Sequence, residues 1–174
     1  MNLILVRHGE SEANFRGISQ SAKDEWSDTI LTKKGIEQAG KLAERLRFEK
    51  IDYIYCSDLK RAKQTANKIN KFHNLNIIFD KQIRDVSKHE TLEDIIGRAK
   101  SFLRDVEKKD GNILVVCHGG ICLTLLAITT GSREKGGKLV NKYKDSQKNT
   151  CVNIVEKVHG KYKIKLIGCV KHLT

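Results

Sequence analysis

The sequence predicts an α/β fold, a three-layer α/β/α sandwich with a mainly parallel central sheet. Short continuous apolar runs, typical of buried strands, alternate along the chain with longer segments whose apolar residues recur at helical spacing. Strands separated by helices need crossover connections, and crossovers place helices on both faces of a parallel sheet. The 174 residues contain no linker and no internal repeat, so we expect a single domain over residues 1–174.

Three strands are predicted in the first half of the chain, over residues 3–6, 51–56 and 76–79. The first is a continuous apolar run, the pattern of a strand that is buried on both faces, and the third is weaker. Residues 11–31 are polar and irregular, and we expect them to form a loop at the functional site.

Two helices are predicted between these strands. Thr32 is placed to cap the first helix. The inward face of that helix carries Ile36, Ala39, Leu42, Ala43 and Leu46. Either Ser57 or Asp58 is placed to cap the second helix. The inward face of the second helix carries Leu59, Ala62, Ala66 and Ile69.

The second half of the chain opens with its clearest amphipathic pattern, which predicts a helix. The apolar face of this helix consists of Leu92, Ile95, Ile96, Ala99, Phe102, Leu103 and Val106. A strand over residues 113–117 follows, and then a helix of about three turns over residues 120–129. Residues 151–156 and 162–167 are predicted to be a closing pair of strands that turns at residues 159–160.

Composition argues against several classes of protein. No segment is long or apolar enough to span a bilayer, and the N-terminal apolar stretch is too short for a signal peptide, so we expect a cytoplasmic protein with no membrane partner. The five cysteines form no C-x-x-C pair. We therefore expect free thiols and no zinc site.

The net charge of +12 raises the question of a nucleic-acid partner. The lysines are spread over predicted helix faces and loops, and the densest basic stretch, residues 133–148, is interleaved with Glu134 and Asp145. Its only aromatic residue is Tyr143, whereas single-strand binding uses several stacking side chains. We expect no nucleic-acid partner, and the sequence leaves the oligomeric state open.

Two of the predicted strands end at a histidine. Arg7 and His8 follow strand 3–6, and His118 follows strand 113–117. Open α/β folds bind ligands at the carboxyl edge of the sheet, so two imidazoles are expected to meet there. The charge of Arg7 should lower the pKa of His8, and a neutral imidazole on a rigid strand end is a good nucleophile. We predict that His8 attacks an anionic group, a phosphoryl group, with Arg7 as its electrophilic helper.

Two further features suit an anion. Arg61 lies in the first turn of the helix after strand 51–56, where positive charge opposes the helix dipole and so does not serve helix stability. An arginine there can bind a phosphate through two parallel hydrogen bonds. The glycine pair after His118 lets the backbone at Gly119 approach a ligand, and the following helix offers free N–H groups. A protonated His118 would share the charge of phosphate oxygens.

Three other motifs fit less well. Cys56 and Arg61 are separated by four residues, whereas the loop of cysteine phosphatases needs five. In residues 131–138 a glycine stands where a P-loop needs its lysine. A metal ion on His8 and His118 would lie beside two arginines, which is unfavourable unless carboxylates outnumber them. We expect no metal and no cofactor.

Four blocks of the chain resemble the histidine phosphatase superfamily, the phosphoglycerate mutase-like group. They are Arg-His-Gly-Glu-Ser at 7–11 with Asn14, Leu-Thr-Lys-Lys-Gly at 31–35, Ser-Asp-Leu-Lys-Arg-Ala at 57–62 and Val-Val-Cys-His-Gly-Gly at 115–120. The blocks occur in the family's order and cover most of the chain. The chain is identified as a compact member of this superfamily with a short cap, the segment that closes over the substrate.

The resemblance implies a metal-independent phosphomonoesterase. His8 would attack phosphorus in line and become a phosphohistidine, and water would then release phosphate. Arg7, Arg61 and His118 would hold the three equatorial oxygens. Substrate-binding residues are expected to be Asn14, Gly119, Ser21 and Glu10.

The chain departs from the family pattern at the general acid. The family commonly has a glutamate in a Leu-x-Glu context, and here residues 83–85 are Ile-Arg-Asp. Asp85 is one methylene shorter and is the expected acid, although Arg84 would tend to keep it ionised. Glu90 is the second candidate.

The second departure concerns the cap. Only a few residues separate Asp85 from the helix that starts near Thr91, where mutase-like members insert a long segment. A pocket without this segment should be shallow and open to water, which favours a phosphatase over a mutase. Specificity would come from residues 15–30 and 81–91.

The expected partner is a phosphorylated small molecule or a phosphoprotein. Three alternatives stay open at this point. They are a protein phosphohistidine phosphatase, a phosphoglycerate mutase and a non-catalytic module that binds a phosphorylated ligand.

Overall fold

A computed structural model describes residues 1–18 and 28–174 of the chain, and within them six strands form one sheet in the order β3-β2-β4-β1-β5-β6. The strands are β1 (Asn2–Arg7), β2 (Tyr53–Cys56), β3 (Ile77–Phe79), β4 (Asn112–Cys117), β5 (Val152–Val158) and β6 (Lys161–Cys169). The first four run parallel, and β5 is antiparallel to both of its neighbours, β1 and β6. The prediction of a mainly parallel sheet is confirmed.

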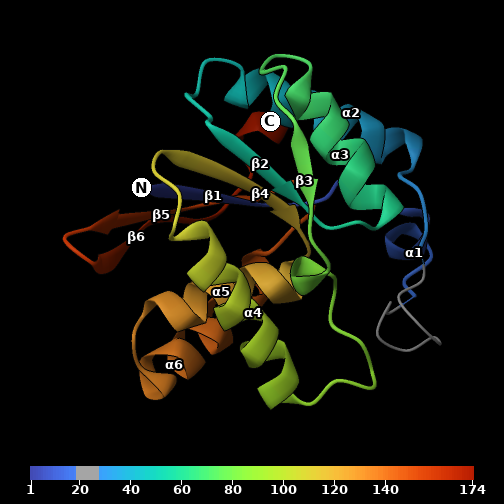
Figure 1. Cartoon of the computed structure of the whole chain (residues 1–174). Coiled ribbons are helices and arrows are strands. Elements are labelled where there is room, and N and C mark those ends of the chain that lie inside the picture. Colours follow the sequence, from blue (N-terminus) through green and yellow to red (C-terminus); the bar gives the residue numbers. More distant parts are fainter. Residues whose placement is uncertain (19–27) are drawn as a thin grey trace.

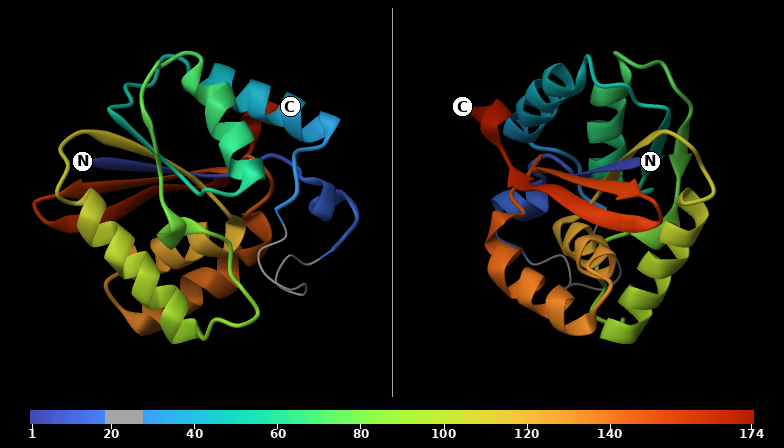
Figure 2. Two further views of the ribbon diagram at one scale, coloured as in Figure 1. Left: turned by 45° about the vertical axis from the view of Figure 1, so that its right-hand side comes forward. Right: turned by 90° about the vertical axis from the view of Figure 1, so that its left-hand side faces the viewer.

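Helices cover both faces of this sheet (Figures 1 and 2). The α-helices of the described residues are α1 (Glu12–Phe15), α2 (Lys33–Leu46), α3 (Lys60–Asn70), α4 (Leu92–Val106), α5 (Gly119–Thr129) and α6 (Arg133–Tyr143). α2 and α3 lie on one side of the sheet, and α4, α5 and α6 lie on the other. The predicted three-layer sandwich is thus confirmed.

The apolar run of β1 supplies both layers of the core. Leu5 packs with Phe102 of α4 in one buried cluster, whereas Val6 packs with Leu42 of α2 in the other. Consecutive side chains of a strand point to opposite faces, so a strand covered on both sides needs apolar residues at every position. None of the described helices is both long enough and apolar enough to cross a bilayer.

The predicted starts of the helices are confirmed for α2 and corrected for α3. Thr32 Oγ1 accepts a hydrogen bond from the Gly35 amide over 3.0 Å at the start of α2. The residue that precedes α3 is Leu59, and neither Ser57 nor Asp58 caps that helix. Asp58 is paired with Arg84, and Ser57 Oγ contacts His118 and the Leu59 amide. Ile36, predicted to face inward, is 39% exposed.

Two helices were not predicted. α1 is a single turn within the segment expected to be a loop, and Ser11 caps it together with Asn14. α6 lies in the basic stretch and contains two adjacent glycines, which lower helix propensity. A Cβ at Gly136 would lie 3.0 Å from the carbonyl oxygen of Ala127 on α5, so glycine permits the close packing of these helices.

The strand ends place the functional site. β4 lies between β1 and β2, and the register pairs Arg7 with Cys117 and Cys56 with Val116. The three strands therefore stop at one edge of the sheet, and His8 and His118 follow directly. This is the edge where open α/β folds bind ligands.

Candidate active site

His8 is held rigidly at the end of β1. Its side chain is 1% exposed, Nδ1 lies 2.7 Å from the carbonyl oxygen of Gly9, and Nε2 lies 3.2 Å from Nε of Arg61. Because a guanidinium can only donate, Nε2 must accept, and the ring proton is on Nδ1, which donates to Gly9. Burial, and then the charges of His118, Arg61 and Arg7, hold the pKa of His8 well below its usual value. The ring is neutral at pH 7 with its Nε2 lone pair toward the cationic groups.

Arg61 is fully buried in the first turn of α3. Besides its contact with His8, its NH2 group donates to Oδ2 of Asp85 over 3.1 Å. Burial lowers the pKa of this guanidinium, since its charge is removed from water, and the Asp85 carboxylate partly offsets the effect. A buried cation of this kind attracts an anion strongly.

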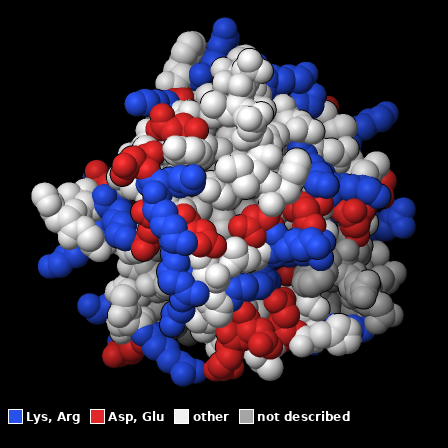
Figure 3. All heavy atoms as spheres, in the orientation of Figure 1, with Lys and Arg blue, Asp and Glu red and all other residues white. Residues whose placement is uncertain are grey.

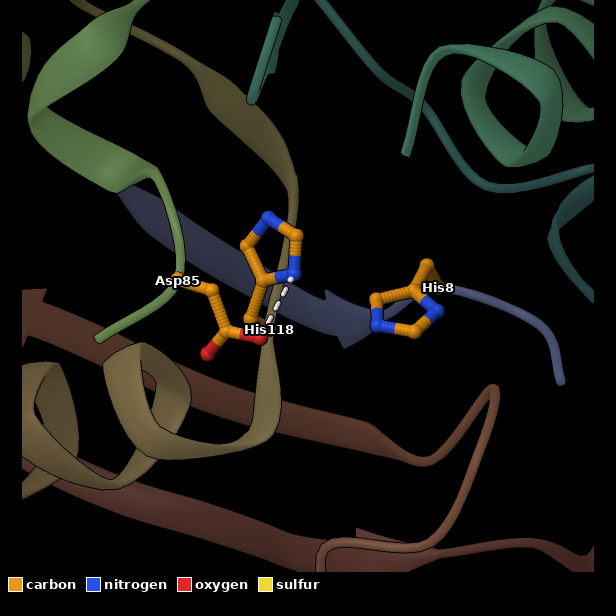
Figure 4. A group of neighbouring side chains, drawn as sticks. All are labelled: His8, Asp85 and His118. Carbon is orange, nitrogen blue, oxygen red and sulfur yellow. Dashed lines mark ion pairs between the residues drawn. The ribbon is translucent and has the colours of Figure 1, made fainter. Parts of the chain in front are cut away.

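His118 forms the opposite side of the site, between β4 and α5. Its Nε2 lies 2.9 Å from Oγ of Ser57, and its Nδ1 lies 3.5 Å from Oδ2 of Asp85. The ring centroids of His8 and His118 are 5.0 Å apart. Burial, followed by the charges of Arg61 and other arginines, keeps the pKa of His118 well below its usual value. Figure 4 shows the side chains of His8, Asp85 and His118 gathered where β1 and β4 end.

Arg7 opens onto a small pocket beside the two histidines. Its NH1 group donates to the carbonyl oxygen of Gln147 over 2.6 Å, and its buried Nε has no hydrogen-bond partner among the described residues. The pocket, of about 230 Å³, is lined by Arg7, Asp85, Gly119, Gly120, Leu123, Lys144 and Gln147. A Cβ at Gly119 would lie 3.4 Å from Cδ of Arg7, so glycine leaves the arginine room.

The arrangement suits an anion better than a cation. One ligand atom each from His8, Asp85 and His118 lie within 4.8 Å of one another, which is a spacing a metal ion could use. However, Arg61 already donates to both His8 and Asp85, so a metal ion would have to displace a buried cation and then remain beside it. A phosphoryl group is instead attracted by the charge of Arg61. Its oxygens can take the position of Asp85 Oδ2 between Arg61 and His118.

The structure describes two of the remaining residues that were predicted to bind substrate, Asn14 and Glu10. Asn14 Oδ1 accepts hydrogen bonds from the Ser11 amide and from Asn149 Nδ2, and Asn149 also donates to the carbonyl oxygen of His8. Asn14 is therefore linked to the backbone of His8 through Asn149. Ser21 lies outside the described residues.

The carboxylate of Glu10 is engaged by the start of α2. Its Oε1 accepts from Thr32 Oγ1 over 2.8 Å, and its Oε2 lies 3.2 Å from Nζ of Lys34. These contacts join the segment after β1 to α2. A Cβ at Gly35 would overlap the carbonyl oxygen of Glu10, so the two backbones pack closely as well.

Arg84 makes a two-pronged contact with Asp58, whose Oδ1 and Oδ2 each lie 2.6 Å from a guanidinium nitrogen. This hydrogen bonding lowers the pKa of Asp58. Glu90, the second candidate acid, is paired with Arg98 of α4.

Several residues of the site were not predicted. Ser57 contacts His118, and Thr65 Oγ1 accepts from the Gly9 amide over 3.1 Å. Both lie in or next to the block at 57–62. Their proximity to Arg61 in the sequence could therefore have indicated that they belong to the site. Gln147 and Asn149 come from the loop before β5, and no pattern in the sequence relates that loop to His8.

The fold and the site are those of an α/β enzyme that acts on phosphoryl groups. Its enzyme class is phosphoric monoester hydrolase. The model of the histidine phosphatase superfamily (branch 1) matches residues 3–88 and 85–170. The chain belongs to this superfamily.

Named relatives and solved structures agree with this assignment. Phosphoserine phosphatase 1 of Hydrogenobacter thermophilus is 31% identical over 153 residues, covering 68% of this chain and 71% of the relative. The phosphoglycerate mutase-like protein 4 of Arabidopsis thaliana is 29% identical over 210 residues, covering 98% and 86%. The crystal structure of an Entamoeba histolytica phosphoserine phosphatase variant has a TM-score of 0.81 at 20% identity and covers 99% of both chains. The last similarity concerns the fold.

Proposed function

We propose that this protein hydrolyses a small phosphate monoester through phosphorylation of His8 at Nε2. The observation that carries the proposal is the meeting of His8, Arg61 and His118 around Oδ2 of Asp85, with Arg61 donating to both His8 and Asp85. A phosphoryl oxygen in place of this carboxylate oxygen would accept from Arg61 and His118. Phosphorus would then lie next to the His8 lone pair.

The reaction has two steps. In the first, His8 Nε2 forms a bond to phosphorus, the ester P–O bond breaks, and protonated Asp85 gives its proton to the leaving oxygen. In the second step Asp85 accepts a proton from water as the water attacks phosphorus and the P–N bond breaks. The fixed charges of Arg7 and Arg61 stabilise the transferred group in both steps.

The substrate is proposed to be a small phosphorylated acid. The exposed Lys144 lines the pocket of about 230 Å³ together with Arg7. A carboxylate on the substrate could pair with the ammonium of Lys144. The name of the Hydrogenobacter thermophilus relative, a phosphoserine phosphatase, supports this class.

We also propose that the protein acts in the cytoplasm and on a small molecule. The cysteines Cys56, Cys117, Cys122, Cys151 and Cys169 are free thiols, which suits the reducing cytoplasm. On the face in Figure 3, basic and acidic side chains lie side by side rather than in a continuous basic surface, which supports a small-molecule partner rather than a nucleic acid.

The test is to trap the intermediate. The wild-type protein incubated with a ³²P-labelled phosphate ester and stopped rapidly should carry an acid-labile, base-stable label, and His8→Ala should carry none. Turnover of an aryl phosphate should continue in excess chelator. Loss of turnover in chelator, or an acid-stable label, would contradict the proposal. Faster interconversion of 2- and 3-phosphoglycerate than phosphate release would indicate a mutase instead.

A further inference from the structure

One arginine of α4 holds the whole loop that carries Asp85. The side chain of Arg98 is 15% exposed, and its NH1 group donates to the carbonyl oxygens of Gln82 and Arg84, each over 2.7 Å. Its NH2 group donates to the carbonyl oxygen of Asp85 over 3.0 Å. The carbonyl oxygens of the two peptide groups that flank the Cα atom of Asp85 are therefore bound to one rigid, planar group.

Glu90 completes the contact from the other end of the loop. Its two carboxylate oxygens lie 2.6 Å from Nε and 3.1 Å from NH2 of Arg98. Oε2 of Glu90 also accepts from the Ser87 amide over 2.8 Å. Arg98 and Glu90 thus close the segment between residues 82 and 90 around a single ion pair. We call this pair, with the loop carbonyls it binds, the Arg98 clamp.

The loop is fixed on its other side as well. Arg84 is bound to Asp58 at the end of β2. Val86 lies against the start of α5, where a Cβ at Gly120 would be 3.0 Å from its Cγ2. The side chain of Asp85 is directed to Arg61 and His118. Residues 84–90, between a short 3-10 helix (Lys81–Ile83) and α4, form no helix or strand that would fix this side chain. These contacts, together with the hydrogen bond from the Val86 amide to Asp85 Oδ1, therefore set the position of Asp85.

We propose that Arg98, with Glu90, is a positioning residue that holds Asp85 where it exchanges a proton with the leaving group. The inference rests on the proposed function, because it takes Asp85 as the acid. A proton donor must lie within hydrogen-bond reach of the leaving oxygen, and displacement by about 1 Å costs orders of magnitude in rate. A guanidinium fork meets several acceptors in one plane, whereas a lysine ammonium is a point charge. Arg98→Lys is therefore not a conservative change here.

The experiment compares good and poor leaving groups. A poor leaving group needs the acid more, so Arg98→Gln should lower kcat for phenyl phosphate by about tenfold or more and kcat for p-nitrophenyl phosphate by about threefold or less. Asp85→Asn should show the same asymmetry. The double variant should be no slower than Asp85→Asn alone, since both changes remove one function. Arg104→Gln, an exposed arginine on the same helix, is the matched control and should leave both rates unchanged.

The outcomes separate the two proposals. Equal slowing of both substrates, or slowing by Arg98→Gln that adds to that of Asp85→Asn, would overturn the positioning role and leave the phosphatase intact. Absence of His8-dependent turnover in the wild type would overturn the proposed function itself. Thermal unfolding is measured for each variant. If Arg98→Gln does not fold, Glu90→Gln, which keeps the shape and removes the charge, decides by the same comparison.

Discussion

Nε of Arg61 donates a hydrogen bond to Nε2 of His8 over 3.2 Å, and both side chains are buried. His8 and a cation from a different segment of the chain are thus paired. The contact selects the tautomer of His8 whose Nε2 lone pair faces the site, because an arginine cannot accept a hydrogen bond. In the proposed reaction, Arg61 would therefore both orient His8 and supply charge.

Replacing Arg61 should therefore impair chemistry more than folding. Arg61→Gln removes a preorganised cationic donor, and the loss of one such donor lowers kcat by roughly 10²- to 10³-fold. Steady-state rates with p-nitrophenyl phosphate measure the effect. Lys60→Gln, the exposed neighbour on α3, is the matched control and should change kcat little. A loss below about threefold in Arg61→Gln would remove Arg61 from the chemistry.

The pH dependence of activity should show the lowered pKa of His8. Burial first, and then the charges of His118, Arg61 and Arg7, disfavour its protonation. The neutral nucleophile therefore persists at pH values where an ordinary histidine would be charged, and activity is lost only as the pH falls through the lowered pKa. The acidic limb of kcat/KM, which reports on the free enzyme, should have its midpoint below about 6.5. A midpoint above that value would contradict the assignment.

Two glycines of α2 should respond oppositely to the same substitution. At Gly35 a Cβ would overlap the carbonyl oxygen of Glu10, whereas at Gly40 it would meet nothing within 4 Å. Gly35→Ala should lower the free energy of unfolding by about 1–3 kcal/mol, as overpacking does. Gly40→Ala should raise it by up to about 1 kcal/mol through helix propensity. Urea unfolding curves measure both. Similar effects at the two positions would show that the backbones near Glu10 and Gly35 do not pack as described.

Lys144 should affect the binding of acidic substrates rather than the chemical step. Lys144→Ala should raise KM for a phosphorylated carboxylic acid such as phosphoserine by about tenfold and leave kcat nearly unchanged, because the lost contact is made equally before and during reaction. The KM for p-nitrophenyl phosphate, which has no carboxylate, should stay the same. Lys148→Ala is the matched control at an exposed lysine nearby. An equal rise in KM for both substrates would exclude selection of a carboxylate by Lys144.

Much of the site could be predicted because of where parallel strands end. Leu3 to Val6 and Ile113 to Cys117 are apolar at every position, which predicts strands buried on both faces, and the residues that follow such strands share one edge of the sheet. His8 and His118 were expected to meet for this reason. Asp58 shows where this reasoning ends. Its position before a helix predicted a cap, but Arg84, which is 26 residues away in sequence, binds it instead.

The sequence by itself determined the alternation of strands and helices, and the histidines and arginine at the strand ends, because burial and periodicity are local properties of the chain. Only the tertiary structure decided which charges are paired, as with Arg98 and the carbonyl oxygen of Asp85, or Arg7 and that of Gln147. It also decided that α6 forms despite its glycines, since packing on α5 outweighs propensity. A side-chain pair depends on where the folded chain brings two segments together, and neither segment encodes that alone.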